Sequence, residues 1–286
     1  MNEDLRRETV RAALATRTRL GIERTSPVCP FDAAERLGVE VKFRNETSME
    51  GMYCRTTRPT ILVSAHRPAG RRAYTCGHEL GHHVLGHGTR IDELVDNASK
   101  RATRDPAEDA ADLFSAMFLM PKPVVSRMFD GDAVTVEEAT SLHVYRIAAR
   151  LGVGYETVLT HLRWSLRLLA EDRYRELARR HVKDIKADLV GYDTSAAVWP
   201  VDGAWYGRPV DVEVGDILVV PPGVAHEGRV LEPAGTGPHG ALLVATRPGL
   251  ARLADGSWST FVRVQRLRFV GRAIFRHLED PDADAE

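Results

Sequence analysis

Residues 73–87 read Ala-Tyr-Thr-Cys-Gly-His-Glu-Leu-Gly-His-His-Val-Leu-Gly-His and contain an H-E-x-x-H motif at His78, Glu79 and His82. Apolar residues recur here at helical spacing, so we predict a helix from residue 68 to about residue 86. On a helix, His78 and His82 share one face, with their Cβ atoms about 5–6 Å apart. Both imidazoles can then reach one metal ion, and Glu79 can take a proton from an attacking water. The competing interpretation is a helix that only presents polar residues to solvent.

A catalytic zinc site with two histidines needs a third protein ligand and one open position. Glu108 and Asp112 are the candidates, because they lie four residues apart in a largely apolar stretch that we predict to be a buried helix from Pro106 to Met120. Glu108 can complete a His₂Glu site, and Asp112 can accept the second ring N–H of a ligand histidine. Two alternatives stay open. The pair can be surface carboxylates at a helix start, or Glu93, in a predicted loop over residues 88–104, can be the third ligand.

Three further stretches extend the pattern on either side of the histidine motif. The residues concerned are Glu50-Gly51-Met52, Ile61-Leu62-Val63-Ser64, Tyr74-Thr75-x-x-His78-Glu79-Leu80-Gly81-His82 and Glu108-x-x-Ala111-Asp112-x-Phe114-Ser115-x-x-Phe118-Leu119-Met120-Pro121. Over roughly residues 25 to 165 this order resembles the ImmA/IrrE family of bacterial metallopeptidases. Ser115 and Phe118 replace residues that are commoner in that family.

The resemblance implies both a fold and a function. It implies a zincin-like metallopeptidase core in which His78, His82 and Glu108 bind one Zn²⁺ ion per chain and Glu79 is the catalytic base. Two histidines and a carboxylate also tolerate other divalent ions, so Mn²⁺ is the alternative metal. The implied partner is a protein substrate, an XRE-type helix-turn-helix repressor whose cleavage derepresses stress or mobile-element genes.

Three other residues near the motif are candidates for oxyanion or substrate contacts. Tyr74 lies one helical turn before His78 and could hydrogen-bond a tetrahedral oxyanion; a core tyrosine is the competing interpretation. His83 and His87 lie four residues apart on a neighbouring helix face. They could contact substrate, form a second metal site or only extend a polar face.

The composition is typical of a folded, soluble protein. The chain has 286 residues, which at ~150 residues per domain suggests about two domains. Its 39 Lys and Arg against 40 Asp and Glu give a formal net charge of −1, which indicates neither nucleic acid nor an anionic membrane as a partner. Three cysteines argue against a disulfide framework, and the first residues lack the apolar segment of a signal peptide. We therefore expect a cytoplasmic protein that crosses no membrane.

The predicted fold class is α+β, in four parts. They are a metallopeptidase core with a short β-sheet and the active-site helix (1–125), a helical segment similar to a helix-turn-helix with a linker (126–189), an all-β domain of unknown role (190–278) and a disordered acidic tail (279–286). Pro121 and Pro123 are predicted to end the helix that begins at Pro106. Short helices are predicted at 136–142 and 145–151, and a helical tract broken once at 155–189.

Gly152 is the predicted turn between two helices of the helix-turn-helix-like segment. The helix that begins at Tyr155 offers few positive charges, so we do not expect direct DNA binding. Two other functions stay open as alternatives. The chain could be a DNA-binding regulator or a ligand-sensing interaction protein, each using the peptidase fold as a scaffold.

Overall fold

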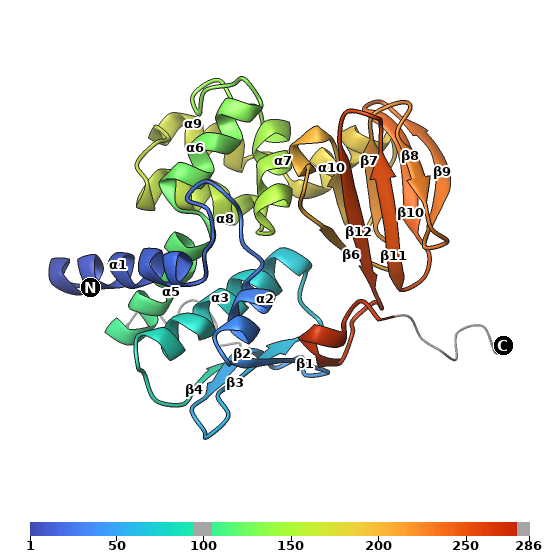
Figure 1. The fold of residues 1–286 in the computed structure, drawn as a ribbon. Helices are drawn as coiled ribbons and strands as arrows, with labels where there is room; N and C mark the ends of the chain where they lie inside the picture. The colour runs from blue at the N-terminus through green and yellow to red at the C-terminus, as the bar shows by residue number, and fades with distance from the viewer. Residues whose placement is uncertain (94–104, 279–286) are drawn as a thin grey trace. The chain divides into compact units, whose positions relative to one another are not determined.

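The computed structural model describes residues 1–93 and 105–278, and the chain divides into two compact units (Figure 1). The first unit comprises Met1–Ala133, Leu151–Gly154 and Val270–Ile274. The second comprises Val134–Arg150, Tyr155–Phe269 and the residues from Phe275 onward. Helices and sheets occur together, which confirms the predicted α+β class. The boundaries expected at residues 125 and 189 stay predictions.

A five-stranded mixed sheet forms the base of the first unit, with the strand order β13-β1-β3-β2-β4. The strands are β1 (Glu40–Arg44), β2 (Met49–Cys54), β3 (Thr60–Ser64), β4 (Arg90–Glu93) and β13 (Gly271–Arg272). β1 runs parallel to β3, and the other neighbours are antiparallel. β4 corrects the loop expected at residues 88–104, since residues 90–93 pair with β2; residues 94–104 lie outside the described part of the chain.

Helices cover this sheet in successive layers (Figure 1). They are α1 (Glu3–Arg19), α2 (Pro30–Arg36), α3 (Ala69–Val84) and α5 (Pro106–Leu119), and α6 (Lys122–Gly131) follows α5 in the chain. α2 and α3 pack on the strands, α5 packs on α3, and α1 packs on α5. The prolines after α5 end that helix as predicted, but a new helix, α6, starts directly at Lys122. Proline is compatible with a first helical turn, where its missing N–H has no intrahelical acceptor.

The helices after residue 134 differ in part from the predicted ones. They are α7 (Ser141–Leu151), α8 (Tyr155–Thr160), a π-helical turn (His161–Ser165), α9 (Glu171–Ala178) and α10 (Val182–Val190). A turn at Gly152, with φ of 68°, joins α7 to α8 as predicted. The helix predicted at 136–142 is wrong, because α7 begins only at Ser141. The tract from 155 is broken more than once, and one break contains Arg167 with a left-handed φ of 55°.

The eight strands between residues 198 and 265 form two four-stranded sheets, which confirms the all-β character predicted for this part of the chain. One sheet has the order β5-β7-β10-β9, with β5 at Val198–Pro200, β7 at Ile217–Val220, β10 at Gly240–Ala245 and β9 at Leu231–Gly237. The other has the order β6-β12-β11-β8, with β6 at Val210–Glu213, β12 at Ser259–Gln265, β11 at Gly249–Ala254 and β8 at Ala225–Glu227. The described residues also include two 3₁₀ turns, at Gly203–Trp205 and Ala273–Phe275.

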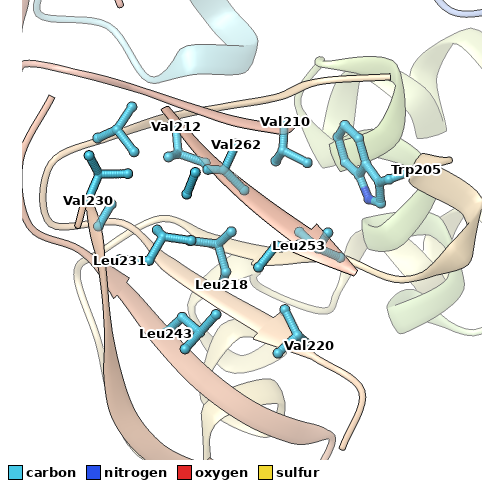
Figure 2. Packing of buried hydrophobic residues seen from close by; sticks show 14 of the residues in the cluster. Trp205, Val210, Val212, Leu218, Val220, Val230, Leu231, Leu243, Leu253 and Val262 are labelled. Carbon is cyan, nitrogen blue, oxygen red and sulfur yellow. The ribbon is translucent and has the colours of Figure 1, made fainter. Parts of the chain in front are cut away.

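The core of this β domain is mainly aliphatic and also contains two buried indoles, those of Trp205 and Trp258. Figure 2 shows Leu218 and Leu243 from one sheet facing Val262 and Leu253 from the other, with Trp205 beside them. In the second sheet, buried and exposed side chains alternate along β11, as expected for a strand that packs one face on the core. Among the described residues, no helix has both the length and the apolar character that crossing a membrane requires.

Candidate metal centre

Helix α3 holds the H-E-x-x-H residues in the interior of the first unit. The helix starts after Pro68, which has no N–H to leave unsatisfied, and it ends before Gly86, whose φ of 75° stops helical propagation. His78, Glu79 and His82 are only 6%, 0% and 1% exposed. The helix therefore directs all three polar side chains away from solvent, which excludes the solvent-facing interpretation of the motif.

One ring nitrogen of each motif histidine meets the carboxylate of Glu108. Nε2 of His78 lies 3.2 Å from Oε2 of Glu108, and Nε2 of His82 lies 3.5 Å from the same oxygen. The two Nε2 atoms are 3.1 Å apart. The three donor atoms thus lie within 4.8 Å of one another, on residues that are buried or half-buried. Two imidazoles and a carboxylate are a common donor set of catalytic zinc sites, so these residues fit a divalent metal.

The other ring nitrogen of each histidine is also engaged. Nδ1 of His78 lies 3.0 Å from Oδ1 of Asp112, one turn after Glu108 on α5. Nδ1 of His82 lies 2.8 Å from Nδ1 of His87, just beyond the end of α3. Contacts of this kind fix the tautomer and the ring orientation of a histidine, so that Nε2 is left for a metal.

The electrostatics of the cluster favour a positive charge at its centre. Burial lowers the pKa of His78, but hydrogen bonds to Asp112 and Glu108 outweigh it and raise that pKa to about 10. The hydrogen bond to His78, followed by that to His82, holds the pKa of the Glu108 carboxyl well below its usual range. A divalent cation bound here would supply the positive charge that this arrangement stabilises.

Small residues bring α5 close enough to α3 for its carboxylates to reach the histidines. A Cβ at Gly77 would lie 2.6 Å from Oγ of Ser115, and one at Gly81 would lie 3.1 Å from Cα of Ala111. The Ser115 hydroxyl also donates to the carbonyl of Tyr74, at 2.9 Å. Sequence reasoning missed these packing residues, although two glycines four apart on a histidine-bearing helix are the signal that indicates a close helix contact.

A third glycine, Gly51 on β2, lies against the side chain of Glu79. A Cβ at Gly51 would lie 2.6 Å from Oε1 of Glu79 and would also overlap Cγ2 of Thr75. Only a residue without a side chain lets the strand approach the helix this closely. Gly51 belongs to one of the quoted motifs, but its sequence context does not predict this contact.

The remaining candidates occupy other positions around the site. The Tyr74 hydroxyl donates to the Asp112 carbonyl at 3.1 Å, and burial raises the pKa of Tyr74. Nδ1 of His83 lies 2.9 Å from the Tyr53 hydroxyl on β2, and burial lowers the pKa of His83. Glu93 is the last residue of β4, and its side chain lies outside the described part. Contacts of Tyr74, His83 and His87 with substrate stay predictions.

Comparison with known proteins supports the resemblance that the motifs carry. Residues 34–163 match the family model of the IrrE N-terminal-like domain, a peptidase family. No curated protein matches the chain. A solved structure of a Mycobacterium tuberculosis transcriptional regulator is similar at 19% identity, with a TM-score of 0.35, over 61% of this chain and 50% of that chain. The chain therefore spans about half the length of the solved structure that it matches.

Proposed function

Because residues 34–163 belong to the IrrE N-terminal-like peptidase family, we propose that this chain is a zinc-dependent endopeptidase. The observation that carries the proposal is the convergence of His78, His82 and Glu108 beside a fully buried Glu79. Three protein donors on two helices leave an open coordination position, which is the arrangement of a catalytic rather than a structural zinc site.

Each residue of the site has a separate role in the proposed peptide hydrolysis. His78, His82 and Glu108 hold the metal, and Asp112 keeps the His78 ring in its ligating orientation. A bound zinc ion supplies a Lewis acid that polarises the scissile carbonyl and lowers the pKa of water toward ~7. Glu79 takes the proton from the attacking water and delivers it to the leaving amine.

The proposed substrate is a helix-turn-helix repressor of the XRE type, cleaved to derepress stress or mobile-element genes. This substrate class follows from the family resemblance, and such a substrate places the enzyme in the cytoplasm. Manganese is the alternative metal, because its preference for nitrogen and carboxylate ligands overlaps with that of zinc.

Glu79→Gln tests the proposal, because the amide keeps the shape of the side chain but cannot accept the proton. We expect the variant to bind zinc as the wild type does and to lose at least about 10²-fold in cleavage rate. The assay incubates the zinc-loaded chain with a purified XRE-type helix-turn-helix repressor, taken from a neighbouring gene where one encodes it, and identifies the fragments by mass spectrometry. Equal cleavage by the variant, or an intact repressor with the zinc-loaded wild type, contradicts the proposal.

A further inference from the structure

The end of helix α3 folds back onto one of the metal ligands. The backbone N–H of Gly86 donates to the carbonyl of His83 at 3.2 Å, and that of His87 donates to the carbonyl of His82 at 2.9 Å. With Gly86 in the left-handed region, these two bonds form a Schellman motif. In that motif the side chain of the last residue contacts the side chain of the residue five positions earlier in the chain. Here those two residues are His87 and His82.

The two imidazoles are in direct contact. Their Nδ1 atoms are 2.8 Å apart, and their ring centroids are 5.0 Å apart with the planes tilted by 60°. A hydrogen bond between two ring nitrogens requires one N–H and one lone pair. If Nε2 of His82 is to ligate a metal, the proton of His82 must be on Nδ1. His87 must then accept this hydrogen bond through the lone pair of its own Nδ1.

We infer that His87 is a positioning residue for the metal ligand His82, equivalent to Asp112 for His78. The inference rests on the proposed metal site and adds a residue that acts through a ligand without touching the metal. Each motif histidine is then held from outside, by a carboxylate on α5 in one case and by the helix cap of α3 in the other. Gly86 and His87, which end helix α3, thus also determine the orientation of the His82 ring.

Three substitutions separate this role from a packing role. His87→Phe keeps a ring of similar size but removes the acceptor, and His87→Leu removes it with a smaller side chain. In His87→Asn, the amide oxygen takes the place of Nδ1 and restores the acceptor. His83→Phe is the matched control, because His83 makes a similar contact with Tyr53 instead of with a ligand.

The readout is zinc affinity, measured by competition with a chromophoric chelator, together with the visible spectrum of the Co²⁺-loaded protein. We expect His87→Phe and His87→Leu to bind zinc about 10–100-fold more weakly than the wild type, with an altered Co²⁺ spectrum. His87→Asn is expected to stay within roughly threefold of wild type, and His83→Phe to match it. Melting of the metal-free proteins shows which variants keep the fold.

Two results overturn the role of His87. The first is that His87→Phe or His87→Leu, in a variant that keeps the fold, binds zinc as tightly as the wild type. The other is His87→Asn binding zinc as weakly as these two, because the acceptor would then not be the cause. Both results leave the proposed peptidase intact if the wild type binds zinc and cleaves. A wild-type chain that binds no zinc overturns the proposed function and this inference together.

Discussion

Gly51 sets the distance between the sheet and the proposed general base. A methyl group at this position would overlap Thr75 and lie 2.6 Å from a Glu79 oxygen. Gly51→Ala should therefore displace Glu79 while leaving the three ligands in place. We expect a fall of about 10²-fold in kcat, because a shift of ~1 Å at a reacting group has that effect. Steady-state kinetics and zinc stoichiometry, measured on the same preparation, check this.

Gly131→Ala is the matched control for Gly51→Ala. Gly131 ends α6, and a Cβ built there meets no atom within 4 Å. Its substitution should leave kcat unchanged and stabilise the protein by up to ~1 kcal/mol through helix propensity. Wild-type kcat in Gly51→Ala, or an equal loss in Gly131→Ala, contradicts the proposed contact between β2 and Glu79.

The closeness of α3 and α5 depends on a glycine of one helix facing a serine of the other. Gly77→Ala places a methyl group 2.6 Å from the Ser115 hydroxyl, so we expect a loss of about 1–3 kcal/mol in the free energy of unfolding. Ser115→Ala removes the overlapping oxygen. In that background Gly77→Ala should become neutral or stabilising by up to ~1 kcal/mol, because alanine is the better helix former.

A double-mutant cycle on urea unfolding measures this coupling between the helices. Ser115→Ala alone also loses the hydrogen bond to the Tyr74 carbonyl, at a cost of about 1 kcal/mol in the free energy of unfolding. The stability of the double variant is therefore compared with that of Ser115→Ala. If Gly77→Ala destabilises both backgrounds equally, contact with the Ser115 hydroxyl is not what requires a glycine at position 77.

Elements with a long periodic pattern were predictable, and those that depend on distant partners were not. The bounds of α3 and α5 agree with the prediction within two residues, because apolar spacing and prolines mark them. The approach of Glu108 and Asp112 to His78 was predictable from their spacing of four on α5, and the role of Glu108 as a ligand stays a prediction. α6 was missed because Pro123 was interpreted only as a stop signal. The contact between His82 and His87 depends on the cap geometry at Gly86, which spacing along a continued helix does not predict.

At the scale of the molecule, the first unit is completed by a segment from near the end of the chain. β13 pairs with β1, with Lys42 opposite Arg272 and Phe43 opposite Gly271. Nε of Arg272 lies 2.7 Å from Oε1 of Glu40, and Ala273 is fully buried. No local pattern predicts a strand of two residues whose partner lies over 200 positions earlier. A fragment that ends near residue 190 would therefore leave the edge of β1 unpaired.

Removal of residues 270–286 tests how much this strand stabilises the sheet. We expect the free energy of unfolding of the first unit to fall by about 1–3 kcal/mol, from lost backbone hydrogen bonds and lost burial. Hydrogen exchange should accelerate at the amides of β1 more than at those of β3, which keeps strands on both sides. A chain that ends at Leu278 is the control, since it keeps β13. Equal β1 exchange in the two truncated chains would show that β13 does not protect this edge.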